Sequence, residues 1–212
     1  IPLMGVIDTS VEWLRLAGKK PDCIFTFAAG GTLVTMIKDA ARLEVQKRGI
    51  TLMDVGICTD EMRPIVGKDL DGWYAPCPLS ILEQAQRGQT AGMPGLESII
   101  MAGKKRRGWD AIDMTSSYIR TWLSTAILIE GIRLGIEKVG FENLTGRVVR
   151  DSLASIKDFT AGGLSDPITM TDSKPYYHDG EWLYQFREGV RCLVTTEKFD
   201  YFGIGEAEGW FE

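Results

Sequence analysis

Three short apolar runs in the first 80 residues constrain the fold more than any other feature of the sequence. The runs Cys23–Phe27, Leu52–Cys58 and Gly72–Pro76 are rich in β-branched, aromatic and other apolar residues, and each is too short for a helix. Helical patterns separate them, a long amphipathic one over 32–47 and a short one over 60–66. Strand alternating with helix is typical of a parallel sheet, so the sequence predicts a doubly wound α/β half-sheet whose first strand is buried on both faces.

After residue 79 the strand–helix alternation ends. Residues 80–112 contain several glycines and the basic run Lys104–Arg107, a composition that indicates a connector. The longest helical pattern covers 113–139 and carries a broad apolar face, and a second amphipathic helix follows over 145–159. Two alternating strands joined through Gly189 predict a hairpin near the end. We therefore divide the chain into the half-sheet at 1–79, the connector at 80–112, and the helices and hairpin at 113–212.

Composition disfavours several classes of protein. Hydrophobic residues make up 44% of the 212, and 24 basic against 29 acidic side chains leave a net charge of -5. Such a chain can bury a core, and its acidic balance argues against nucleic-acid binding. The most apolar helical stretch, 126–129, is bracketed by charges and far shorter than the roughly 20 residues of a membrane span. Because the sequence opens on Ile1 with no initiator Met and no signal core, we expect a processed, truncated or partly observed chain.

Cysteine and histidine usage argues against a metal site and against an enzyme. The four cysteines form no paired metal-binding motif, so we interpret them as buried thiols, with a single Cys58–Cys77 bridge as the alternative. The one histidine, His178, stands in a polar turn. The sequence contains no nucleophile elbow, phosphate loop or zincin pair. It therefore predicts no cofactor, no metal ligand and no catalytic residue.

Two loops are candidates for binding a ligand. Ala28–Gly31 form a turn of small residues after the first strand, where a ligand can approach the backbone and the amides of the next helix. Cys58–Asp60 end the second strand, and the carboxyl ends of parallel strands share one rim, so both loops should face one crevice. Simple turn glycines, and helix N-capping by Thr59 or Asp60, are the structural alternatives.

Six stretches, taken in order, resemble one known family over nearly the whole chain. Three of these stretches resemble parts of the family's second lobe: Lys20–Asp22 leading into an apolar strand, the loop Ala29–Gly31, and the strand at Asp69–Tyr74. The family is that of the periplasmic solute-binding proteins of the branched-chain amino-acid type, also called extracellular ligand-binding receptors, with the type I periplasmic-binding fold. The stretches are 11–25, 29–40, 69–74, 118–135, 150–163 and 168–189.

The resemblance implies a binding function without catalysis. Family members close two lobes around a small molecule, such as an amino acid, amide or aromatic acid, and present it to an ABC permease in the membrane. The resemblance implies a periplasmic or extracellular protein, which could carry a lipid anchor. It also implies a first lobe that this chain largely lacks, and the helices and hairpin of 113–212 would contact that lobe. Where amino-acid binders of the family often have an acidic residue, this chain has Cys58–Thr59 with Asp60 adjacent, which puts amino-acid specificity in doubt. The implied ligand-binding residues are Phe27, Ala28, Ala29, Gly30, Cys58, Thr59 and Asp60, with Gly31 and Tyr118 as further candidates.

Two other functions remain open from the sequence. A sensor of the same fold would signal lobe closure to a regulatory partner and not to a permease. An α/β enzyme would use Asp60, Glu61 or Cys58, but the sequence offers none of them a recognisable base partner.

Overall fold

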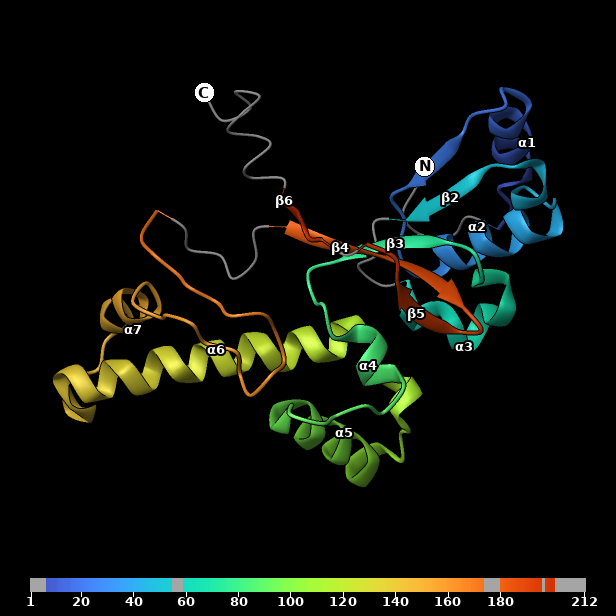
Figure 1. The fold of residues 1–212 in the computed structure, drawn as a ribbon. Helices are drawn as coiled ribbons and strands as arrows, with labels where there is room; N and C mark the ends of the chain where they lie inside the picture. Colours follow the sequence, from blue (N-terminus) through green and yellow to red (C-terminus); the bar gives the residue numbers. More distant parts are fainter. Residues whose placement is uncertain (1–6, 55–58, 174–179, 196, 201–212) are drawn as a thin grey trace. The chain divides into compact units, whose positions relative to one another are not determined.

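The protein divides into two compact units, which the computed structural model describes over residues 7–54, 59–173, 180–195 and 197–200 (Figure 1). The first unit comprises Ile1–Cys77 and Trp182–Lys198, and the second comprises Pro78–Glu181 and Phe199–Glu212. The first boundary lies two residues before the predicted end of the half-sheet at 79. The hairpin expected to pack with the long helix on another lobe belongs instead to the first unit, because it satisfies the open edge of that unit's sheet.

The sheet of the first unit is parallel where the sequence predicts it and antiparallel where the hairpin joins. Its first three strands run parallel, with Ile24 opposite Leu52 and Met53 opposite Tyr74, and the hairpin extends the sheet in the order β1-β2-β3-β4-β5. Gly189, with φ +75°, supplies the left-handed turn residue of the hairpin. The strands in this order are β1 (Cys23–Thr26), β2 (Thr51–Asp54), β3 (Tyr74–Cys77), β4 (Gly180–Arg187) and β5 (Val190–Leu193). The short strand β6 (Phe199–Asp200), assigned to the second unit, pairs with Gly180 and Glu181 at the start of β4.

The helices of the first unit build its core against one face of this sheet. Trp13 packs edge-to-face on Trp73 with ring centroids 6.1 Å apart, and Leu33 and Ile37 are fully buried with them. The helix expected over 32–47 begins two residues earlier and ends at Arg42, because the chain turns there. The helices are α1 (Ser10–Gly18), α2 (Gly30–Arg42), α3 (Arg63–Val66), and the 3-10 turns η1 (Gln46–Arg48), η2 (Asp60–Met62) and η3 (Gly67–Leu70).

The prediction that the first strand is buried on both faces is wrong. Exposure alternates along β1, so that Ile24 and Thr26 are buried while Cys23 and Phe25 are exposed. The side chain pattern follows from the strand period of two, because α1 and α2 cover one face of β1 only.

The second unit is mainly helical, and helices form within residues 80–112, the segment that the sequence indicated as a connector. Residues 94–107, which the glycines made look loose, form the 14-residue helix α5 with Pro94 in its first turn. The long helix α6 packs on α7 through Gly131 and Gly135, where an added Cβ would lie 2.5 Å from the side chain of Leu153 and 2.9 Å from that of Leu144. No helix in the described part of the chain is long and apolar enough to cross a membrane. The elements are α4 (Leu82–Gln86), α5 (Pro94–Arg107), η4 (Ala111–Asp113), α6 (Ser116–Val139), η5 (Phe141–Asn143) and α7 (Gly146–Leu153).

Candidate solute-binding rim

The two candidate loops lie at the same edge of the sheet in the first unit. Thr26 ends β1 and Asp54 ends β2, and the two residues are partners in the parallel ladder. The Thr26 hydroxyl donates to one carboxylate oxygen of Asp54 at 2.8 Å, and the Thr59 hydroxyl donates to the other at 2.6 Å. All three side chains are buried. The segment that begins at Thr59 is therefore tied to the ends of both strands, and we name this edge, from Thr26 to Gly31 and at Asp54, Thr59 and Asp60, the rim.

The loop after β1 offers backbone and not side-chain polar groups. Ala29 is the N-cap of α2 and has no side chain that can accept from the helix amides, and Gly30 begins the helix with φ +58°. Gly30 and Gly31 are exposed, and a Cβ built on either would meet nothing within 4 Å. The first amides of a helix lack intrahelical partners and carry the positive end of its dipole. This loop can accept an anionic group next to the backbone.

Phe27 provides an apolar surface beside these amides. Its side chain is 76% exposed, and Ala28 after it is half-buried. A planar or branched apolar group could therefore lie on Phe27 while its charged end faces the start of α2.

Thr59 and Asp60 are engaged within the protein. Thr59 makes no side-chain capping hydrogen bond, and its hydroxyl is used on Asp54, so helix capping does not explain it. The Asp60 carboxylate accepts from Nη2 of Arg191 at 3.1 Å, and both side chains are at most 2% exposed. Arg191 also lies 5.1 Å from the ring centre of Phe186. A ligand ammonium at Asp60 would have to compete with a buried guanidinium.

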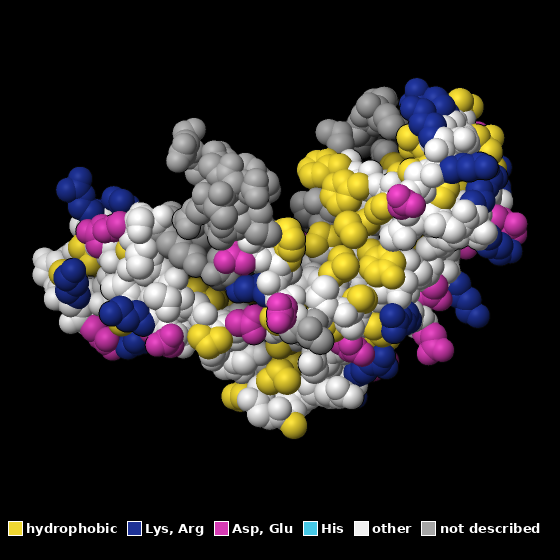
Figure 2. Space-filling view, turned by 45° about the horizontal axis from the view of Figure 1, so that its top comes forward, with side chains coloured by type: hydrophobic (Ala, Val, Ile, Leu, Met, Phe, Trp, Pro, Cys, Tyr) yellow, Lys and Arg dark blue, Asp and Glu magenta, His cyan; other side chains and the backbone are white. Residues whose placement is uncertain are grey.

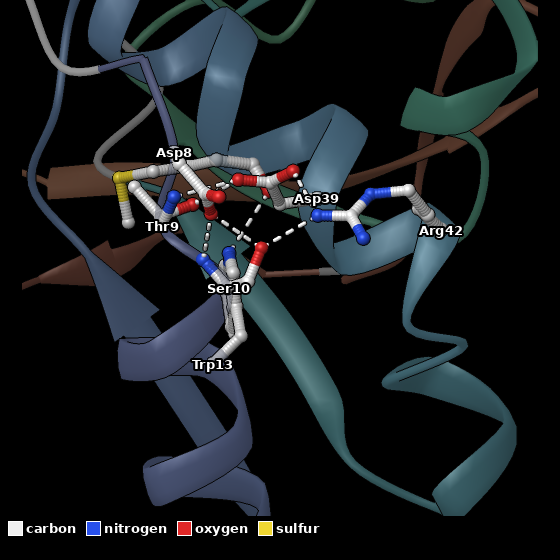
Figure 3. Close-up of polar contacts among 7 residues, drawn as sticks. Asp8, Thr9, Ser10, Trp13, Asp39 and Arg42 are labelled. Carbon is white, nitrogen blue, oxygen red and sulfur yellow. Dashed lines mark hydrogen bonds and ion pairs between the residues drawn. The ribbon is translucent and has the colours of Figure 1, made fainter.

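A cluster of polar side chains joins the start of α1 to the last turn of α2 (Figure 3). The amide and hydroxyl of Thr9 donate to one oxygen of Asp39 at 2.7 and 2.9 Å, and Arg42 donates to the other at 2.8 Å. Burial alone would raise the pKa of Asp39, but the hydrogen bonds from Arg42 and Thr9 outweigh it and hold the pKa below its usual value. The indole of Trp13 donates to the carbonyl of Met36 at 3.0 Å. These contacts fix the helix whose first turn forms the loop.

Two of the remaining candidates are not part of the described rim. Tyr118 belongs to the second unit, where its ring lies 5.1 Å from Trp109 and 6.4 Å from Trp122 in an aromatic cluster. Cys58 lies outside the described residues, as does His178, so a bridge from Cys58 to the buried Cys77 stays a prediction.

Asp54 on the rim, and Arg191, which contacts the rim residue Asp60, were not indicated by the sequence. Asp54 closes an apolar run, a signal that could have marked it as the polar end of β2. Arg191 alternates with apolar neighbours in a hairpin strand, and nothing in that pattern distinguishes a buried arginine from an exposed one. Across the described residues, no three His, Cys, Asp or Glu side chains lie together as a metal site would require.

Comparison with known proteins supports the fold and leaves the function open. No protein-family model and no curated protein matches the sequence. Among solved structures, a branched-chain amino-acid ABC transporter protein from Thermus thermophilus with bound valine is 18% identical, with a TM-score of 0.77, over 97% of this chain and 53% of that one. A leucine-binding protein from Thermotoga maritima is 12% identical, with a TM-score of 0.68, over 94% and 50% of the two chains.

A third structure, an ABC transporter solute-binding protein from R. palustris in complex with benzoate, is 17% identical with a TM-score of 0.61, over 90% and 47% of the two chains. The sequence resemblance is thereby confirmed for the fold: the chain has the fold of part of a type I periplasmic binding protein. It spans about half the length of the solved chains it matches. The names of the solved neighbours describe ABC transporter proteins, a solute-binding protein and an extracellular ligand-binding receptor.

Proposed function

We propose that this chain supplies the second lobe and the return helices of a two-lobed protein that captures a small carboxylate-bearing solute for an ABC importer. The observation that carries the proposal is the start of α2, where exposed and uncapped amides at Gly30 and Gly31 stand on the rim beside Phe27. An amino acid, an amide of one or an aromatic acid would place its carboxylate or carbonyl on these amides and its apolar part on the ring. Valine and benzoate, the ligands named for two solved neighbours, both have a carboxylate next to an apolar group.

The rest of the pocket would come from a first lobe that closes on the rim. The long helix α6 agrees with this, since Trp122 and Ile129, seven residues apart and therefore on one face of the helix, are 37% and 60% exposed. In this proposal the first lobe covers that surface, the protein acts in the periplasm or outside the cell, and the closed form docks on a membrane permease. Its chemistry is binding and release, with no bond made or broken.

The test removes one amide from the start of α2. In the complete product of the gene, Gly31→Pro deletes the Gly31 N–H at a helix position that tolerates proline, and Gly31→Ala keeps the N–H and adds a methyl group to open space. Calorimetric titration with valine, leucine and benzoate should give wild-type affinity for the alanine variant. The proline variant should bind carboxylates roughly 10- to 100-fold more weakly, as expected for one hydrogen bond to a charged group.

Benzamide is the matched ligand for this experiment because it has the ring of benzoate without its charge. Its affinity should change less than that of benzoate in Gly31→Pro. If no carboxylate binds the wild-type protein in the micromolar range, or if both variants bind as the wild type does, the proposed function fails.

A further inference from the structure

The last turn of α5 carries the longest run of basic residues in the sequence. The run is Lys104–Arg107, and all four of its side chains are exposed. On α6, by contrast, Arg133 forms ion pairs with Glu130 and Glu137, and basic side chains are interspersed with acidic ones over α6 and α7 in Figure 2. Within the part of the chain that the structure describes, no residue of the basic run forms an ion pair.

The helix end itself accounts for only part of this charge. The carbonyl groups at the end of a helix carry the equivalent of about half a negative charge, which a single basic residue offsets. The acidic residues that follow, Asp110 and Asp113, are engaged in η4, where each carboxylate accepts from the backbone amide of the other residue in a capping box. Glu97, the acidic residue that precedes the run in α5, is about two turns away from it. The basic run therefore keeps positive charge that it can offer to a partner.

Apolar and aromatic side chains adjoin the basic run. Met101 lies one turn before it, on the same face of α5 as its two lysines, and is 58% exposed. The guanidinium of Arg107 lies 5.0 Å from the ring centre of the half-buried Trp109. Through Tyr118, Trp109 belongs to the aromatic cluster that ends at Trp122, which is 37% exposed. Cations next to tryptophan and an exposed methionine suit a partner that presents both negative charge and an apolar layer.

We propose that the basic run and the side chains next to it rest on the surface of a bilayer that contains anionic lipids. The lysines and arginines lie against the lipid phosphates, and Trp109 and Met101 reach the level of the headgroups, where tryptophan is enriched in membrane proteins. Each basic residue at such a surface contributes about 1 kcal/mol, which is about fivefold in partitioning. A nucleic acid also has phosphates, but it gives the thioether of Met101 no hydrocarbon to enter. The proposal goes beyond solute capture and agrees with it, because a protein that serves an importer works next to a membrane.

Vesicle flotation with the complete product of the gene, prepared without any attached lipid, tests the proposal. The wild type should bind vesicles that contain phosphatidylglycerol in phosphatidylcholine and should not bind vesicles of phosphatidylcholine alone. Raising the ionic strength from about 0.01 M to about 0.15 M shortens the screening length from about 30 Å to about 8 Å and should weaken this binding. The double variant Lys104→Gln with Lys105→Gln should bind about 25-fold more weakly, as expected for the loss of two charges. The matched control is Lys19→Gln with Lys20→Gln, because these adjacent lysines are exposed as well, and it should bind as the wild type does.

Three results overturn the proposal: no binding of the wild type to the anionic vesicles at low ionic strength, equal binding to both kinds of vesicle, or an equal loss of binding in the two double variants. Tighter binding to a DNA duplex than to the anionic vesicles in the same buffer also overturns it and assigns the basic run to a nucleic acid. Equal thermal midpoints of the wild type and both double variants are the control for folding, since exposed substitutions of this kind change stability little.

Solute titration separates this proposal from the proposed function. The variant at Lys104 and Lys105 should bind valine and benzoate as the wild type does, because neither lysine belongs to the rim. Vesicle binding without any carboxylate binding would refute the proposed function alone, and carboxylate binding without vesicle binding would refute the membrane contact alone.

Discussion

Loss of the Asp39 side chain should weaken the first unit, because this carboxylate joins two helices through hydrogen bonds to a buried threonine. Its side chain is 12% exposed and accepts from the amide and hydroxyl of Thr9, a residue that is itself 2% exposed. Asp39→Ala removes the acceptor for both donors. It also removes the carboxylate that Arg42 meets at 2.8 Å.

The magnitude follows from which of these groups stay buried. Leaving a buried donor unsatisfied costs about 1–3 kcal/mol, and Thr9 contributes two donors on neighbouring atoms that a single water could partly satisfy, so we take about 2.5 kcal/mol for the pair. The Arg42 contact adds little, because Arg42 is 59% exposed and an exposed ion pair contributes about 0–1 kcal/mol. Alanine returns about 0.5 kcal/mol of helix propensity within α2. We expect a net loss of about 2 kcal/mol.

Denaturant unfolding followed by tryptophan fluorescence measures this loss, since Trp13 and Trp73 are fully buried beside the cluster. A loss of about 2 kcal/mol corresponds to a thermal midpoint roughly 10 °C lower for a unit of this size. Glu44→Ala is the matched control, because Glu44 forms an ion pair with Lys47 in which both side chains are more than half exposed. If Asp39→Ala unfolds where Glu44→Ala does, the hydrogen bonds to Thr9 do not stabilise the unit and the reasoning is refuted.

Three further outcomes follow from the structure. The pKa of Asp39 is lower in the folded protein than its unfolded value of about 3.9. The stabilisation that its carboxylate provides is therefore complete above that pH and is lost as the pH falls through the lower folded value. Unfolding curves of wild type and Asp39→Ala should converge only below about pH 4. Gly95→Ala places a Cβ 2.2 Å from the carbonyl oxygen of Ala161 and should destabilise the second unit by at least about 2 kcal/mol, whereas Gly146→Ala, with nothing within 4 Å, should be neutral or stabilising in the same calorimetric scan. Arg191→Met removes the guanidinium that meets the buried carboxylate of Asp60 and should cost about 3 kcal/mol, most of which the double variant with Asp60→Leu should restore in denaturant titration.

Helices and strands that depend on neighbouring residues could be predicted from the sequence. The position of a strand that pairs with a strand far away in the sequence could not. The helix at α2 and the strands β1 and β2 follow from residue spacing within about ten positions of each. The place of the hairpin depends on β3 offering an open edge more than 100 residues earlier in the chain, which no local pattern encodes. Glycine frequency misled the prediction for α5, because Gly95 is there for close contact with the Ala161–Gly162 backbone and not for flexibility.

The candidate rim was predictable in position and only partly in chemistry. Parallel strands end at one edge, so the loops after β1 and β2 could be placed together from the sequence. What Asp60 does there depends on Arg191, which comes from β5 and reaches it across 131 positions of sequence. A carboxylate that looks available for a ligand in the sequence is thus already paired in the folded chain.

This pairing determines what the rim can offer to a solute. Asp54 accepts from two threonines and holds the ends of β1 and β2 together, while Asp60 accepts from Arg191 of β5, so both acidic groups of the rim are engaged within the protein. The groups left facing outward are the amides at Gly30 and Gly31 and the ring of Phe27. Amides at a helix start favour a negative charge and an aromatic ring favours an apolar group, so under the proposed function the rim would favour an apolar carboxylate. Under the same proposal, an amino-acid solute would need a partner for its ammonium group from outside the rim, because Asp60 already faces the guanidinium of Arg191.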